Sequence, residues 1–209
     1  MRAALNAWLK RLPEWLGWML GAIPLLWLIF DLAMGAAGPD PVAAVEHRTG
    51  RTGLYFLVAA LVASPVARFA GVEIGRMRRV LGLLGFAYAA LHVAAWMALD
   101  LGFYWPQIAR DLLNRPYLIM GTASALLLLP LALTSNGYAR RALGKWWPRL
   151  HQLAYPAAAL AALHWAWVGK LWEPRPASWL TVILGLAAVR WLPTTQNGTG
   201  RHQSSTKRS

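Results

Sequence analysis

The sequence predicts an all-α membrane protein: a six-transmembrane-helix bundle with both termini in the cytoplasm. Three observations support this fold class: the composition, the long apolar runs, and the uneven distribution of basic residues between loops. Of the 209 residues, 57% are apolar and only 14% are charged, whereas soluble domains carry about 25% charged residues. The mean hydropathy of +0.39 also indicates a chain that lies mostly in lipid.

Helices that cross about 30 Å of hydrocarbon need about 20 mostly apolar residues. Six runs approach this requirement, namely 15–36, 54–69, 80–101, 117–133, 148–169 and 178–191. Runs in lipid must satisfy their own backbone groups, so we expect each to be helical. The first run follows Arg2, Lys10 and Arg11 and so imitates a secretory signal. Its apolar part exceeds the usual length of about 7 to 15 residues, so we interpret it as an uncleaved span.

The domain organisation follows from these runs. Residues 1–193 form one transmembrane domain, because the loops between the runs are too short to hold a soluble catalytic domain. Residues 194–209 are basic and rich in Ser, Thr, Gln and Gly, with too little apolar content to fold, so a disordered tail is predicted. Any chemistry must therefore use the bundle itself or a partner.

The basic residues determine the predicted orientation. The N-terminus, two alternate loops and the C-terminal tail hold 15 of the 21 Lys and Arg residues, and 6 of the 8 acidic residues fall in the other loops. Short loops rich in Lys and Arg stay in the cytoplasm, so both termini are predicted there. We assign the net charge of +13 to topology and attraction to anionic lipid, with a docking surface for a soluble partner as the alternative. Nucleic acid is excluded, because no charged stretch is long enough to form a module.

Three histidines are the candidate functional residues. The chain has no cysteine, which excludes disulfides, iron–sulfur clusters, thiolate zinc sites and thiol catalysis. Ionisable side chains at membrane depth are costly and mark functional sites, and His92, His151 and His164 are the ones within the predicted spans. Proton pumps and ion-coupled transporters usually place carboxylates in the core, which this chain does not do.

Depth along the helices groups two of these histidines. Both helices run outward, and a rise of 1.5 Å per residue places His92 about 18 Å and His164 about 24 Å from the cytoplasmic ends. His151 lies about 20 Å nearer the cytoplasm than His164. Neutral imidazole is a good axial ligand for haem iron, and the small residues Gly85 and Ala161 relieve bulk near the matched pair. The alternative is hydrogen bonding between helices, and for His151 interfacial hydrogen bonding and haem ligation stay open.

Three ordered motifs resemble a known family. They are Arg79-Val-Leu-Gly-Leu through Leu91-His92, Arg115-Pro-Tyr-Leu through Leu133-Thr-Ser, and Leu143-Gly-Lys-Trp-Trp-Pro-Arg-Leu-His151 through Leu163-His164. Together they resemble the MsrQ family of haem-binding membrane subunits, within the ferric-reductase-like transmembrane group. The resemblance covers about residues 49–190.

The resemblance implies a b-type cytochrome subunit that is not itself an enzyme. Such a subunit passes electrons outward from the quinone pool or a cytosolic flavin reductase. The acceptor is a periplasmic molybdopterin-containing methionine sulfoxide reductase, which repairs oxidised periplasmic proteins. The resemblance also implies one or two haem b groups and FMN, the latter without assignable residues. By position, His92 and His164 are implied as axial ligands of an outer haem and His151 as a ligand nearer the cytoplasm.

The chain departs from the wider group at the position expected for a second histidine on the third predicted span. Members of that group carry two histidines on each of two helices, but here Arg78 stands 14 residues before His92. An inner haem would lack its second imidazole, and Arg78 either pairs with a propionate or only anchors the helix to the inner surface. His151 is also turned about 220° from His164, unless Pro156 bends the helix.

The chain also lacks the nucleotide-binding module of the oxidase and ferric-reductase members, so electrons must arrive from another molecule. Two alternative functions remain: a stand-alone ferric or quinone reductase, and a non-haem transporter or scaffold whose histidines only join helices.

Overall fold

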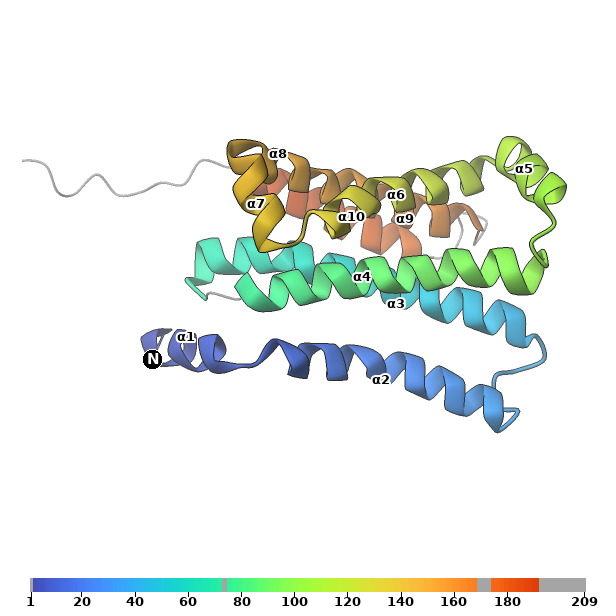
Figure 1. Ribbon diagram of the computed structural model, residues 1–209, viewed down its shortest axis with the longest axis horizontal. Helices are drawn as coiled ribbons and strands as arrows, with labels where there is room; N and C mark the ends of the chain where they lie inside the picture. The colour runs from blue at the N-terminus through green and yellow to red at the C-terminus, as the bar shows by residue number, and fades with distance from the viewer. Residues whose placement is uncertain (1, 73–74, 169–173, 192–209) are drawn as a thin grey trace, which may run out of the picture.

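The computed structural model describes residues 2–72, 75–168 and 174–191, and every element within these ranges is helical (Figure 1). The longer helices are α2 (Glu14–Ala33), α3 (Pro41–Pro65), α4 (Gly75–Ala95), α6 (Pro116–Leu133), α9 (Ala154–Val168) and α10 (Pro174–Trp191). The shorter ones are α1 (Arg2–Arg11), α5 (Trp105–Asn114), α7 (Gly137–Leu143) and α8 (Trp147–Leu150). The predicted tail, 194–209, lies outside the described residues.

The apolar helices make the chain a multi-pass membrane protein. In the part that the structure describes, four helical segments are long and apolar enough to cross a membrane: Glu14–Ala33, Pro41–Ala70, Gly75–Asp100 and Pro116–Leu133. The second and third of these include a π-helical turn at the end of α3 and of α4. The two remaining predicted spans also fall on helices, but α9 has 15 residues and the apolar part of α10 is Ser178–Val189. The all-α membrane class is confirmed.

The start of α3 differs from the prediction. The helix begins at Pro41, well before residue 54, because Asp40 caps it: the Asp40 side chain accepts a hydrogen bond from the Ala43 N–H at 2.9 Å. Proline is favoured in the first turn of a helix, where its missing N–H costs nothing. Charged residues in the first turns lower the hydropathy there, and this hid the helix. His47, which lies between two of the predicted spans, is therefore helical.

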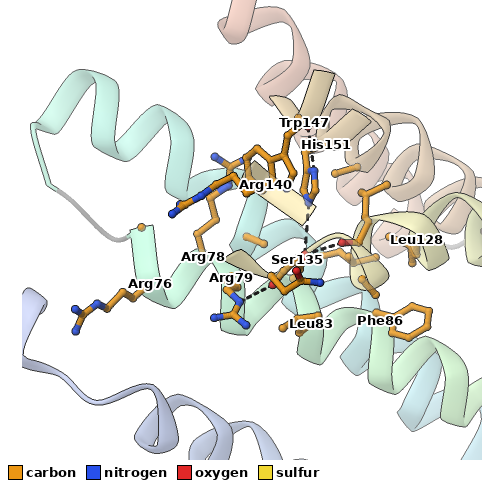
Figure 2. Close-up of a pocket in the computed structure, with 18 of the residues that line it drawn as sticks. Arg76, Arg78, Arg79, Leu83, Phe86, Leu128, Ser135, Arg140, Trp147 and His151 are labelled. Atoms are coloured by element: carbon orange, nitrogen blue, oxygen red, sulfur yellow. Dashed lines mark hydrogen bonds between the residues drawn. The ribbon is translucent and has the colours of Figure 1, made fainter. Parts of the chain in front are cut away.

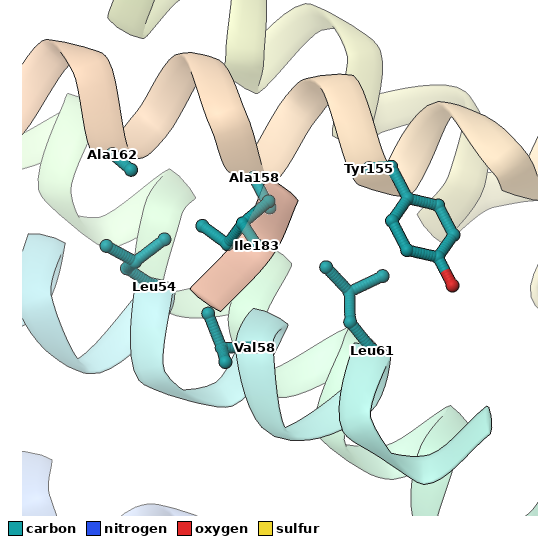
Figure 3. Packing of buried hydrophobic residues seen from close by; sticks show 7 residues of the cluster. All are labelled: Leu54, Val58, Leu61, Tyr155, Ala158, Ala162 and Ile183. Carbon is teal, nitrogen blue, oxygen red and sulfur yellow. The ribbon is translucent and has the colours of Figure 1, made fainter. Parts of the chain in front are cut away.

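The core lies between α3, α9 and α10. Figure 3 shows side chains of these three helices in contact, and the buried cluster comprises Leu54, Val58, Leu61, Tyr155, Ala158, Ala162 and Ile183. Ala158 and Ala162 are completely buried. Because small side chains let helix backbones approach closely, these alanines allow α9 to lie against α3.

The helix pair α3 and α4 is also held together by small residues. A Cβ added to Gly53 would lie 3.2 Å from the Ala89 nitrogen, and one added to Gly85 would lie 2.8 Å from Leu57 side-chain atoms. The expectation that Gly85 leaves open space beside His92 is therefore wrong, because Leu57 of α3 fills that space. Likewise Ala161 packs against the core between α3, α9 and α10.

Helix α2 lies along the outside of the α3–α4 pair (Figure 1). Most of its apolar side chains are exposed. One polar link to the bundle is the Tyr88 hydroxyl, which donates to the Gly21 carbonyl at 2.8 Å and accepts from the Leu25 N–H at 3.0 Å. Figure 1 also shows α1, α7 and α8 at one end of the molecule and α5 at the other.

Candidate functional site

Two histidines from different helices meet inside the bundle. His92 of α4 and His164 of α9 have ring centroids 6.0 Å apart, with their planes inclined by 68°. The residues are 72 positions apart in the sequence, and the structure brings their rings to one level. Both side chains are half-buried. The Tyr117 ring packs beside the pair, with its centroid 6.0 Å from that of the His164 ring.

Each of these imidazoles is oriented by a backbone carbonyl of a neighbouring helix. His92 Nδ1 lies 2.9 Å from the Glu46 carbonyl oxygen, and His164 Nδ1 lies 2.7 Å from the Tyr117 carbonyl oxygen. A carbonyl oxygen only accepts hydrogen bonds, so Nδ1 must carry the proton in both rings. Each neutral ring then keeps an unprotonated Nε2, which is the atom that binds a metal.

The other end of the bundle contains a basic cavity of about 550 Å³ (Figure 2). Arginines from two helices line it: Arg76, Arg78 and Arg79 of α4 and Arg140 of α7. Apolar side chains form the remaining wall, among them Leu57, Leu83, Phe86 and Leu128. His151 and Trp147 also line this cavity. A cavity with an apolar wall and several cations suits a flat organic molecule that carries negative charge.

His151 belongs to this cavity and not to the histidine pair. Its ring stacks on Trp147, with centroids 3.9 Å apart and planes inclined by 26°. Its Nδ1 lies 3.1 Å from the Trp147 carbonyl oxygen, and its Nε2 lies 3.4 Å from Ser135 Oγ. The Trp147 carbonyl accepts the Nδ1 proton, so Nε2 is unprotonated in the neutral ring; the Ser135 hydroxyl and the Leu131 backbone also lie near the imidazole.

A break in the helix sets the direction of His151. One turn of 3-10 helix, His151–Leu153, separates α8 from α9. Pro156 has no N–H, so the Gln152 carbonyl cannot make its usual α-helical hydrogen bond, and the helix tightens before it resumes at Ala154. The even 100° rotation that would separate His151 and His164 by about 220° therefore does not apply across this turn.

Arg79 connects α4 to two other segments that line the cavity. Its Nε donates to the Ser135 carbonyl at 2.7 Å (Figure 2). Its guanidinium also lies 3.5 Å from the Glu14 carboxylate. Arg78, the candidate propionate partner, lines the same cavity as His151. The sequence pointed to Arg78 alone; Arg76, Arg79 and Arg140 were assigned to membrane topology, because charge in a loop gives no sign of the cavity it faces.

Comparison with known proteins identifies the family. Residues 49–162 match the family model described as ferric reductase like transmembrane component. The chain is 42% identical over 175 residues to the protein-methionine-sulfoxide reductase haem-binding subunit MsrQ of Salmonella dublin, which covers 83% of this chain and 88% of the relative. The chain belongs to the MsrQ family.

MsrQ haem-binding subunits from Salmonella newport and Salmonella agona match with the same identity and coverage. His92 and His151 lie inside the segment that matches the ferric reductase model, and His164 lies just beyond its end. No solved structure matches the chain.

Proposed function

We propose that this protein is a b-type cytochrome subunit that carries electrons across the bacterial inner membrane to a periplasmic, molybdopterin-containing methionine sulfoxide reductase. The observation that carries the proposal is the pair His92 and His164, whose rings approach to 6.0 Å inside a membrane bundle. The curated MsrQ relatives are named as haem-binding subunits of a protein-methionine-sulfoxide reductase. Both observations favour electron transfer over catalysis by this chain.

The histidine pair fits a haem held by two axial ligands. His92 and His164 lie with ring centroids 6.0 Å apart, each with an unprotonated Nε2, and neutral imidazole is a good ligand for haem iron. The described residues contain no group of three or more His, Cys, Asp or Glu side chains that could hold a bare ion. Two imidazoles suit a porphyrin, which supplies the other four nitrogens itself. His92 and His164 would therefore hold the outer haem.

The basic cavity supports a second binding position on the inner side. His151 presents an unprotonated Nε2, and Arg78 lines the same cavity, so these residues suit an iron ligand and a propionate partner of an inner haem. The cavity volume of about 550 Å³ is within the usual range for organic ligands. FMN rests on family resemblance alone, and we assign it no residues.

The proposed direction of transfer follows from the charges. The end of the bundle with the arginine-lined cavity carries the basic loops, so we place it in the cytoplasm, with six spans and both termini inside. Electrons would enter there from the quinone pool or a cytosolic flavin reductase. Haem, when bound, supplies a one-electron iron couple. The residues of the chain orient the ligands, exclude water and hold the propionate charge.

The decisive experiment measures haem and its electron acceptor together. We expect purified protein in detergent to give a reduced-minus-oxidised b-type spectrum, with one or two haems per polypeptide by chemical quantification. Reduced protein should be reoxidised by the periplasmic reductase in the presence of methionine sulfoxide. A stable but colourless protein would contradict the proposal and favour a transporter or scaffold. Reoxidation by ferric chelates or quinones alone would favour a stand-alone reductase.

The topology is tested by labelling single cysteines, since the natural chain has none. Asn114→Cys lies on the outer side in the proposed orientation, and Tyr138→Cys and Ser204→Cys lie inside. A maleimide that cannot cross membranes should label Asn114→Cys in spheroplasts and should label the other two only after permeabilisation. Tyr138 is 77% exposed, so protection at this position cannot come from burial. Labelling of Ser204→Cys in intact spheroplasts would disprove the six-span arrangement.

A further inference from the structure

The two paired histidines are supported by the same backbone arrangement, which occurs twice. His92 bonds to the Glu46 carbonyl of α3, and His164 bonds to the Tyr117 carbonyl of α6. Four residues after each of these carbonyls stands a glycine: Gly50 after Glu46 on α3, and Gly121 after Tyr117 on α6. The same pattern therefore recurs on two helices that share no other motif.

Both glycines touch the histidine rings at the same edge. A Cβ added to Gly50 would lie 3.2 Å from His92 Nδ1, and a Cβ added to Gly121 would lie 2.9 Å from His164 Nδ1. In both cases the three nearest atoms all belong to the histidine ring. Real Cβ atoms almost never approach other atoms closer than 3.0 Å, so even alanine at position 121 would force the ring to move.

The four-residue spacing has a physical reason. In an α-helix the carbonyl of residue i accepts the N–H of residue i+4, so a second donor must approach that carbonyl beside residue i+4. Any side chain on residue i+4 occupies part of this approach. Glycine leaves it open, and the imidazole N–H reaches the carbonyl at hydrogen-bonding distance. The histidine then has a fixed tautomer and a fixed ring direction.

We infer that Gly50 and Gly121 are positioning residues that seat His92 and His164 on the Glu46 and Tyr117 carbonyls and so direct both Nε2 atoms at one haem iron. This inference rests on the proposed function. It extends the site from two helices to four, because α3 and α6 orient ligands that α4 and α9 carry. Hydrogen bonds of this kind also raise the basicity of the ligand and lower the reduction potential of the iron.

The test compares four Gly→Ala variants of the full-length protein. Gly50→Ala and Gly121→Ala introduce a methyl group against a histidine ring. Gly85→Ala is the packing control, since its Cβ would lie 2.8 Å from Leu57 and away from both histidines. Gly185→Ala is the neutral control, since nothing lies within 4 Å of its added Cβ. The measurements are haem per polypeptide, the midpoint potential, the electron paramagnetic resonance spectrum of oxidised protein, and thermal stability.

We expect Gly121→Ala to weaken haem retention about tenfold or more, as loss of a ligand's hydrogen-bonding partner usually does. Gly50→Ala should have a smaller effect, because its Cβ meets the ring at 3.2 Å. The haem that remains in both variants should show a raised midpoint potential and altered resonance anisotropy, since the imidazole planes are turned. If Gly121→Ala does not accumulate, the milder Gly50→Ala variant decides the question with the same measurements.

The outcomes separate this inference from the proposed function. Wild-type protein without haem would refute the proposed function itself. Suppose that wild-type protein binds haem but Gly50→Ala and Gly121→Ala have the same haem content, potential and resonance spectrum as Gly185→Ala. That result would overturn only the positioning role. The same holds if both variants merely lose thermal stability as Gly85→Ala does, with unchanged potential and spectrum, because the glycines would then serve packing alone.

Discussion

His164→Ala is expected to lose the outer haem, with haem retention at that position reduced at least about tenfold, and His92→Ala should do the same. The two rings come from separate helices and their centroids lie 6.0 Å apart, so in the proposed site each would supply one ligand to the same iron. Removing either leaves an open coordination position in a half-buried site. The low-spin spectrum of a doubly ligated haem should therefore disappear in both variants.

The control for this experiment is His47→Ala, since His47 is an exposed histidine on α3. This variant should keep the wild-type haem content and spectrum. Haem is measured by quantification per polypeptide in purified protein, together with the reduced-minus-oxidised spectrum. Wild-type spectra in both His92→Ala and His164→Ala would show that the imidazole pair only joins helices, and the proposed electron path would lose its outer iron.

His151→Ala should remove the second haem and leave the outer one in place. His151 lines the basic cavity, and its Nδ1 is already bonded to the Trp147 carbonyl, which leaves Nε2 as the ligating atom. Where the wild-type protein binds two haems per polypeptide, we expect the variant to bind one. The spectrum that remains should be the one lost in His164→Ala, so the two variants should give complementary halves of the wild-type signal.

Arg78→Gln tests the charge of the same cavity. A cation beside a propionate favours the reduced iron, whose site carries one more negative charge, so its removal should lower the midpoint potential of the inner haem. Arg141→Gln is the matched control, because Arg141 is exposed and does not line the cavity. Redox titration of both variants measures the effect. If Arg78→Gln and wild type have identical potentials and His151→Ala keeps the wild-type haem content, the cavity does not bind a haem.

Local chemistry was sufficient to predict much of the fold. The apolar runs that became α2 and α6 were located to within a few residues, because hydropathy acts residue by residue. The level shared by His92 and His164 followed from the constant rise of a helix, which needs only sequence counting. Helix ends with caps and charged residues were harder to predict from the sequence, since Asp40 starts α3 far ahead of its apolar part. The amphipathic helix α5 was missed because it lies outside the spans.

Composition, charge placement and the three motifs by themselves predicted an all-helical membrane protein of this family and indicated three candidate histidines. Only the tertiary structure showed what orients those histidines. The Glu46 and Tyr117 carbonyls and the glycines beside them lie more than 40 residues from the rings they contact, on other helices. The basic cavity likewise joins segments from α2 to α9. Every residue has a backbone carbonyl, so the ones that accept an imidazole proton are selected by how helices pack, and packing is a property of the folded chain as a whole.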